Sequence, residues 1–349
     1  MTAHEKNAFG KMQTTHTGFV GVVLLGLLAM WAQPTTSRPD WERINGVTLD
    51  ARRAPRPALY DELADLGTTH VALIPYAFFR EGDLRFNSEA RWFSESGSGA
   101  SALADSLALR EIQVTLKPQV WMGNGQFPGD LDFDDASGWE RFEEGYREYA
   151  LHHAAIARDI DSDWFVVGTE LARSAIERPE FWRSLIAEVR EVFPGRLTYA
   201  ANWWAEADSV VFWDDLDAIG VQAYYPMAAE VDATDFAQSW AAHSATLEGL
   251  AQQWKKPLIF TEIGYRSMSD AAVEPWAWTP RRSSAEPDPA MQAALYAAFF
   301  DGPWKASWLS GAYIWKWYGQ EVTERQSLDF TPQGKPAEAL IRRAFQAQQ

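Results

Sequence analysis

The chain contains no cysteine among its 349 residues, which excludes disulfides, thiolate zinc sites, iron–sulfur clusters and cysteine nucleophiles. Basic residues are also in deficit, with 31 Lys and Arg against 48 Asp and Glu, and the resulting net charge of −17 repels nucleic acid. Glycine-rich phosphate loops are missing as well, because the chain around the first predicted strand, Gly46–Asp50, contains neither GxGxxG nor a P-loop. We therefore expect no nucleic-acid partner and no cofactor.

Large apolar side chains, by contrast, are abundant. Hydrophobic residues make up 47% of the sequence and charged residues 23%, which is typical of a soluble globular protein with a sizeable core. The 18 Trp stand out, because such large rings are often kept where a flat apolar face meets a ligand. Sugars are one class of ligand with such a face.

The amino-terminal region has the pattern of an export signal. Residues 18–32 carry no charge and follow a weakly basic start. This run is shorter than the roughly 18–20 apolar residues of a transmembrane helix, and its end at Met30–Gln33 is a poor cleavage site, so a cleaved signal and a retained anchor both remain open. We predict a signal or anchor with a tether over residues 1–39 and one folded domain over residues 40–349. The protein is expected to be exported, and to be periplasmic, secreted or attached to the membrane through residues 18–32.

From residue 40 onward, short apolar runs alternate with longer amphipathic ones, which indicates repeated βα units. Predicted helices include Trp139–Arg158, with a capping box at Ser137 and Glu140, and Pro179–Phe193. Eight strand–helix units favour a single (β/α)8 barrel, a TIM barrel, over an open doubly wound sheet. The eight predicted strands are Ile44–Leu49, His70–Ile74, Gln113–Lys117, Trp164–Gly168, Leu197–Ala201, Ala218–Ala223, Leu258–Thr261 and Ala312–Trp315.

Two of these strands end in a glutamate. Glu170 follows the fourth strand and Glu262 the seventh, and the carboxyl ends of barrel strands meet at one mouth, where the chemistry of this fold takes place. Two carboxyl groups suit glycosidic cleavage, because one protonates the leaving oxygen while the other attacks or supports the anomeric carbon. A single glutamate at a strand end is often only a cap or a solvated rim residue. The joint occurrence of the two predicts a catalytic pair.

The other strand ends carry polar and aromatic side chains of the kind that bind sugar hydroxyls and stack on sugar rings. A shift of one residue in strand register would turn any one of them away from the site. The candidate substrate-binding residues are Lys117, Trp121, Asn202, Trp203, Tyr224, Tyr225 and Trp315.

Two further patterns contain the residue types of metal sites. The acidic loop Gly129–Asp135 resembles a calcium loop, but Asp135 and Arg141 stand where that motif needs glycine and glutamate, so a solvated loop is the better interpretation. The pair His152 and His153 lacks HExxH or a spaced carboxylate, which argues against zinc. We predict no metal.

Three segments carry a resemblance to a known family. They are Gly168–Leu171, Ile219–Pro226 and Phe260–Tyr265, and Leu116–Gln119 is similar as well. Together they resemble glycoside hydrolase family 113, which comprises retaining (β/α)8 enzymes of clan A that act mainly as β-mannanases. The resemblance extends from about Asn45 to Tyr318.

This resemblance implies roles for the predicted site residues. Glu170 would be the acid/base and Glu262 the nucleophile, with Tyr224 or Tyr225 near the nucleophile and Trp315 under the sugar at the cleavage point. The expected activity is retaining hydrolysis of β-linked, mannose-containing oligo- or polysaccharides. The alternatives are a non-catalytic carbohydrate-binding barrel and a clan A glycosidase with another sugar specificity. One departure affects the sugar assignment: many clan members have Asn directly before the acid/base to bind the 2-hydroxyl, whereas this chain has Thr169.

Overall fold

The protein is described by a computed structural model in which the predicted export segment lies outside the described residues. No helix of the described part is long and apolar enough to cross a membrane. The described residues are 41–347, apart from 88–91, 124, 229–234 and 279–284.

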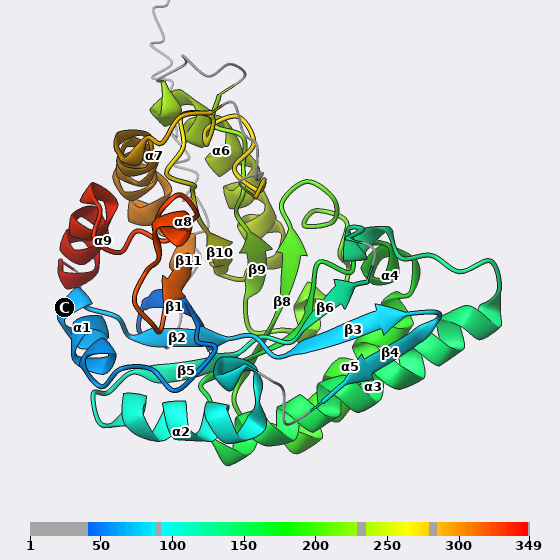
Figure 1. The fold of residues 1–349 in the computed structure, drawn as a ribbon. Helices are drawn as coiled ribbons and strands as arrows, with labels where there is room; N and C mark the ends of the chain where they lie inside the picture. The colour runs from blue at the N-terminus through cyan, green and yellow to red at the C-terminus, as the bar shows by residue number, and fades with distance from the viewer. Residues whose placement is uncertain (1–40, 88–91, 124, 229–234, 279–284, 348–349) are drawn as a thin grey trace, which may run out of the picture. The chain divides into compact units, whose positions relative to one another are not determined.

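Eight parallel strands form a closed barrel, and their order around the barrel follows their order in the chain (Figure 1). Pairing of the first strand with the last closes the barrel. Each of the eight predicted runs lies on a barrel strand, so the prediction of a TIM barrel is confirmed. The strands are β1 (Ile44–Asp50), β2 (His70–Leu73), β5 (Gln113–Leu116), β7 (Trp164–Thr169), β8 (Arg196–Asn202), β9 (Ile219–Gln222), β10 (Leu258–Ile263) and β11 (Leu309–Tyr318).

Helices surround the barrel (Figure 1). The predicted capping box is wrong, because α3 begins earlier and Asp135, in an extended conformation, accepts the hydrogen bond from Gly138 N–H at 2.9 Å. The helices are α1 (Ala58–Leu66), α2 (Gly97–Ala108), α3 (Ala136–Asp159), α4 (Ala172–Glu177), α5 (Pro179–Val192), α6 (Phe236–Trp254), α7 (Pro289–Asp301), α8 (Glu324–Ser327) and α9 (Pro336–Gln346), with 3-10 turns at Phe93–Glu95, Pro128–Asp130, Trp213–Asp215 and Pro303–Lys305.

A small second sheet, which the sequence pattern did not predict, extends from the carboxyl ends of β2 and β5. It consists of β3 (Tyr76–Arg80), β4 (Asp83–Phe86) and β6 (Gln119–Met122), with β3 antiparallel to β4 and parallel to β6. Phe86 anchors the hairpin on α3, since its ring lies 5.2 Å from that of Tyr149. This sheet therefore builds one wall beside the mouth of the barrel.

Side chains fill the half of the barrel interior that lies toward the amino ends of the strands. Trp164 and Tyr313 point inward from β7 and β11 and pack with Ile44 and Ile259, all four nearly fully buried. The Tyr313 hydroxyl shares a hydrogen bond of 2.5 Å with Thr115 Oγ1, so the polar end of this ring is satisfied inside the barrel. Because side chains fill this half, a ligand cannot pass through the barrel, and the chemistry of this fold takes place at the carboxyl ends of its strands.

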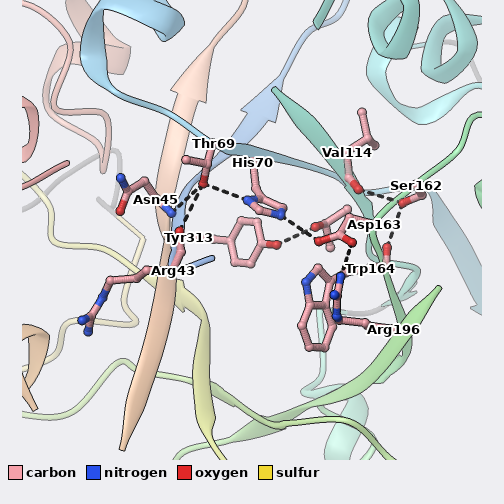
Figure 2. A network of polar contacts seen from close by, with 11 residues as sticks. Arg43, Asn45, Thr69, His70, Val114, Ser162, Asp163, Trp164, Arg196 and Tyr313 are labelled. Atoms are coloured by element: carbon pink, nitrogen blue, oxygen red, sulfur yellow. Dashed lines mark hydrogen bonds and ion pairs between the residues drawn. The ribbon is translucent and has the colours of Figure 1, made fainter. Parts of the chain in front are cut away.

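A polar network ties the strands together at the amino end of the barrel (Figure 2). His70 Nε2 lies 3.0 Å from Asp163 Oδ2, and Arg196 Nη1 donates to Asp163 Oδ1 at 2.5 Å. Thr69 Oγ1 contacts the other ring nitrogen of His70 at 2.8 Å. Burial works to raise the pKa of Asp163, but the contacts with His70 and Arg196 outweigh it and hold that pKa below its ordinary value. A cavity of 490 Å³ opens beside these residues, and Trp41 also lines it. The network joins β2, β7 and β8 far from the strand ends that carry the glutamates.

Candidate active site

Glu262 lies in a buried polar cage near the end of β10. Its side chain forms an ion pair with Lys117, which follows β5 and is itself 1% exposed. The Tyr224 hydroxyl donates to Glu262 Oε2 at 2.6 Å, and Lys117 Nζ also donates to Gln222 Oε1 at 3.0 Å. Lys117 approaches Oε1 and Tyr224 approaches Oε2, so both carboxylate oxygens have a donor, as a buried anion requires.

Glu170 lies directly after β7, in a backbone conformation that residues other than glycine seldom adopt. Its φ of +53° lies in the left-handed region, which is unfavourable for a residue other than glycine. The backbone N–H of Glu170 donates to Ala200 O at 3.0 Å, and Asn202 Nδ2 donates to Glu170 Oε1 at 2.7 Å. Two contacts from β8 thus fix the direction in which this carboxyl group points.

The two glutamates differ in their electrostatic environment. Burial, followed by the negative charge of Glu262, raises the pKa of Glu170 to about 7, while hydrogen bonds from Asn202 and Gln222 and the charge of Lys117 oppose the rise. Glu170 therefore keeps a proton up to neutral pH, whereas Glu262 has a cation and a hydroxyl as partners. A proton donor and an anion at one mouth are the two groups that acid-assisted nucleophilic substitution needs.

Aromatic rings surround the two carboxyl groups. Trp315, on β11, is 8% exposed and belongs to a cluster with Ile74, Tyr224 and Phe330, against which Tyr76 and Trp203 also pack. Lys117 Nζ lies 5.6 Å from the centre of the Trp315 ring, so this indole is next to the cation that holds Glu262. The cluster supplies apolar faces beside charged groups, as expected of a sugar site.

The remaining predicted site residues lie farther from the two carboxyl groups. The ring of Tyr225 packs against Trp203 at 5.2 Å and His243 at 4.5 Å, so Tyr224 is the tyrosine that contacts Glu262. Trp121 lies on β6 of the small sheet, is 51% exposed, and meets Tyr76 edge-on at 6.4 Å. Trp121 therefore belongs to the rim.

The structure also brings residues to the mouth that sequence reasoning missed. Asp50 Oδ2 and Lys316 Nζ form an ion pair of 2.6 Å between the ends of β1 and β11, with Lys316 Nζ 5.4 Å from the Trp315 ring centre. Asp50 ends β1 and Lys316 lies near the end of β11, so both carried the same signal in the sequence as Glu170. Gln222, between the two glutamates, ends β9 and offered the same signal. Glu206 lies in the turn after β8, where the sequence pattern did not mark it as a site residue.

Asp135 of the acidic loop and His153 of the histidine pair both make local contacts of α3. Among the described residues, no three His, Asp or Glu side chains are arranged to hold a metal ion. His153 is buried in α3, with Nδ1 2.9 Å from Tyr149 O, and burial lowers its pKa to about 4. Asp135 acts as the cap of α3.

A family profile and two similar structures point to the same family. The sequence profile of Glycoside Hydrolase Family 113 matches residues 51–335. A family 113 β-1,4-mannanase structure is 26% identical with a TM-score of 0.75, covering 88% of this chain and 100% of its own. The family 113 β-mannanase AaManA from Alicyclobacillus acidocaldarius, in complex with ManMIm, is 27% identical with a TM-score of 0.77, covering 89% and 99%. A family 5 mannosidase from Rhizomucor miehei shares the fold, at 10% identity and a TM-score of 0.61, covering 89% and 93%. A search of curated protein sequences finds no match.

Proposed function

The chain belongs to glycoside hydrolase family 113, and from this premise we propose that it hydrolyses β-linked, mannose-containing saccharides with retention of configuration, using Glu170 and Glu262. One observation carries the proposal. A glutamate with a pKa of about 7 shares the barrel mouth with a second glutamate that is held by Lys117 and Tyr224. This difference in environment separates the acid from the nucleophile.

In the first step, a carboxylate oxygen of Glu262 attacks the anomeric carbon and forms an ester bond with it. The bond between that carbon and the leaving oxygen breaks, its electron pair stays with the oxygen, and Glu170 supplies the proton. Lys117 and Tyr224 orient the attacking carboxylate through their contacts with its two oxygens. Asn202 holds Glu170 toward the leaving group.

In the second step, the ionised Glu170 takes a proton from a water molecule whose oxygen attacks the same carbon from the opposite side. The ester bond breaks, Glu262 leaves as a carboxylate, and Glu170 has regained its proton. Two inversions at the anomeric carbon give net retention. Loss of the negative charge on Glu262 during the first step favours ionisation of Glu170, since that charge is one cause of its raised pKa.

The aromatic and polar residues of the mouth are proposed to bind the sugar. Trp315 offers an indole face beside Lys117, and we propose that this face lies under the sugar at the cleavage point. Trp203, packed on the same cluster, and the exposed Trp121 on the small sheet are candidate stacking surfaces farther along the chain of sugars. Tyr225 is proposed to act by supporting Trp203.

Mannose is favoured because two similar structures of the family are β-mannanases. Thr169, at the position where many clan members use Asn, is buried and donates its hydroxyl hydrogen bond to Pro118 O at 3.0 Å. The Thr169 side chain is thus occupied by the backbone, so a contact with the sugar 2-hydroxyl has to come from another strand end. A panel of gluco- and manno-configured substrates decides between mannose and another sugar.

The test uses the purified protein with mannan, mannooligosaccharides and aryl glycosides, and reads the configuration of the first product by proton NMR. We expect β-configured product from a β-linked mannoside. Glu262→Ala should be inactive, with azide restoring turnover to give the α-glycosyl azide, whereas Glu170→Ala should still cleave aryl substrates with good leaving groups. An α-configured first product, or wild-type activity in either variant, would overturn the assignment.

We also propose that the protein is exported by residues 18–32. The support is the uncharged run behind a weakly basic start. A fusion to a reporter that is active only outside the cytoplasm should be active, and Leu25→Lys should abolish that activity. The matched control, Thr36→Lys in the predicted tether, should leave export unchanged. Full reporter activity with Leu25→Lys would contradict the proposal.

A further inference from the structure

Two buried side chains that the proposed mechanism does not use, Tyr199 and Glu206, connect the chain on both sides of Glu170. The Tyr199 hydroxyl accepts a hydrogen bond from Leu171 N–H at 2.9 Å and donates one to Glu206 Oε2 at 2.8 Å. Glu206 Oε1 in turn accepts from Asn202 N–H at 2.8 Å. Leu171 directly follows Glu170, and Asn202 holds the Glu170 carboxyl group, so these contacts form a closed ring.

The ring is built to be rigid. Tyr199 and Glu206 are both 0% exposed, and the Tyr199 ring is packed edge-on against Trp182 and Phe212, with centroid distances of 5.1 and 5.6 Å. The main-chain amides of Leu171 and Asn202 have these buried acceptors, and buried donors left without a partner are destabilising. The ring therefore fixes the backbone at the end of β7 and at the end of β8 together.

Glu170 needs such support because of its conformation. Its positive φ is unfavourable for a residue with a side chain and persists only where the surroundings determine it. The ring holds the residue after Glu170 through Tyr199, and holds the side-chain partner of Glu170 through Glu206. Relaxation at either place would move the acid/base carboxyl away from the leaving oxygen.

From this geometry we infer that Tyr199 and Glu206 are positioning residues that keep Glu170 aligned for proton transfer. The inference rests on the proposed function, since it assumes that Glu170 is the acid/base. Within the described part of the chain, neither residue contacts the polar cage of Glu262 or the aromatic cluster around Trp315. The inference thus assigns a role to two residues outside both groups.

The charges around Glu206 determine which replacement is conservative. Burial, and the charge of Glu170, raise the pKa of Glu206 to about 8, while the contacts with Asn202 and Tyr199 oppose the rise. Glu206 is thus mostly neutral at pH 7, which makes glutamine the conservative replacement. Its carbonyl oxygen can accept from Asn202 N–H, and its amide group can keep the contact with Tyr199 with the direction reversed, the amide N–H donating to the tyrosine oxygen. Glu206→Gln should keep the ring, whereas Glu206→Leu and Tyr199→Phe should break it.

The discriminating measurement compares two substrates at pH 6. A mannooligosaccharide needs a proton on its leaving oxygen, whereas a dinitrophenyl β-mannoside does not. Tyr199→Phe should lower kcat/KM for the mannooligosaccharide by about 10- to 100-fold and leave kcat/KM for the aryl substrate within about twofold. With the aryl substrate kcat should fall, because the second step needs Glu170 as base, and azide should restore it.

A matched control separates positioning from general stability. Tyr146→Phe also removes a buried hydroxyl that bonds the backbone of β7, at Val167 O, but that hydroxyl is not part of the ring. It should lower the melting temperature and leave the ratio of kcat/KM for the two substrates unchanged. Glu206→Gln should leave the ratio within about threefold, in line with a conserved ring.

Amide exchange reads the ring without any turnover. Hydrogen exchange followed by mass spectrometry should show Leu171 and Asn202 exchanging faster in Tyr199→Phe and Glu206→Leu than in wild type or Glu206→Gln. Unchanged exchange, or a fall in kcat/KM that is equal for both substrates, would overturn the inference while leaving the proposed function intact. A wild-type protein that cleaves neither substrate would overturn the proposed function first.

Discussion

Replacing Glu170 by glutamine should stabilise the protein at alkaline pH, although it removes the acid/base. Glutamine keeps a carbonyl oxygen for the hydrogen bond from Asn202 and removes a negative charge that lies near Glu262. In the wild type, that charge has to form in a largely buried place beside a second carboxylate. The folded state therefore resists the ionisation that the unfolded chain undergoes freely.

The size of the effect follows from the pKa. Folding raises the pKa of Glu170 from 4.5 to about 7, and at about 1.4 kcal/mol per pH unit this corresponds to roughly 3 kcal/mol. Part of the Glu170 surface is exposed at the mouth, and screening by water reduces the effect to about 2 kcal/mol. Because the folded state holds the proton longer, wild-type stability falls as pH rises from 4.5 to about 7 and stays lower above that.

Chemical denaturation of wild type and Glu170→Gln between pH 4 and pH 9 measures this difference. The two proteins should be equally stable near pH 4, and the variant should be more stable by about 2 kcal/mol above pH 7.5, which corresponds to roughly 3 °C in melting temperature for a domain of this size. Equal stability at every pH, or a variant less stable at pH 8 than the wild type, would refute the reasoning about Glu170.

Three further predictions follow from the same structure. Hydrolysis of mannooligosaccharides should decline above about pH 7 as Glu170 loses its proton, and the decline in kcat/KM should be absent with dinitrophenyl glycosides. Trp315→Ala should lower kcat/KM of the folded fraction by about 100-fold. The control Trp164→Ala, in the filled half of the barrel, should cost about 3–5 kcal/mol of stability and leave the activity per folded molecule unchanged. A large loss of stability with unchanged kcat/KM in Trp315→Ala would show that Trp315 belongs only to the core. Asp163→Asn should lower the free energy of unfolding by about 1–3 kcal/mol at pH 7 with kcat/KM unchanged. Denaturation experiments at lower pH should show this loss shrinking as the pH falls through the pKa of Asp163, which folding holds below its ordinary value of 3.8.

The barrel could be predicted from the sequence because its strands are buried on both sides. Both β7 and β10 begin with an apolar run, at residues 164–167 and 258–260, and the eight-fold repetition of such runs leaves few other folds. The small sheet was missed because β3 and β4 are short and partly exposed, and because β6, the second partner of β3, follows only after α2 and β5. Pairing with β6 depends on the barrel already being in place.

Within the site, the placement of the two glutamates at the barrel mouth could be predicted because each lies at the carboxyl end of a strand. The choice between Tyr224 and Tyr225 could not, since β9 ends at Gln222 and alternation of side chains no longer applies beyond a strand end. The ring through Tyr199 and Glu206 was equally inaccessible. A glutamate in a turn is normally solvated, and only the folded chain shows that this one is buried against Asn202 N–H.

The measurement that tests the central claim most directly is the trapping of the covalent intermediate. The wild-type protein is incubated with 2-deoxy-2-fluoro-β-mannosyl fluoride. The fluorine at C2 slows both steps, whereas the good fluoride leaving group keeps the first step fast enough for the covalent intermediate to accumulate. Mass spectrometry of the intact protein and of its peptides should find one fluoromannosyl group, attached to Glu262. A label on another residue, or no label on a protein that hydrolyses β-mannosides, would contradict the account.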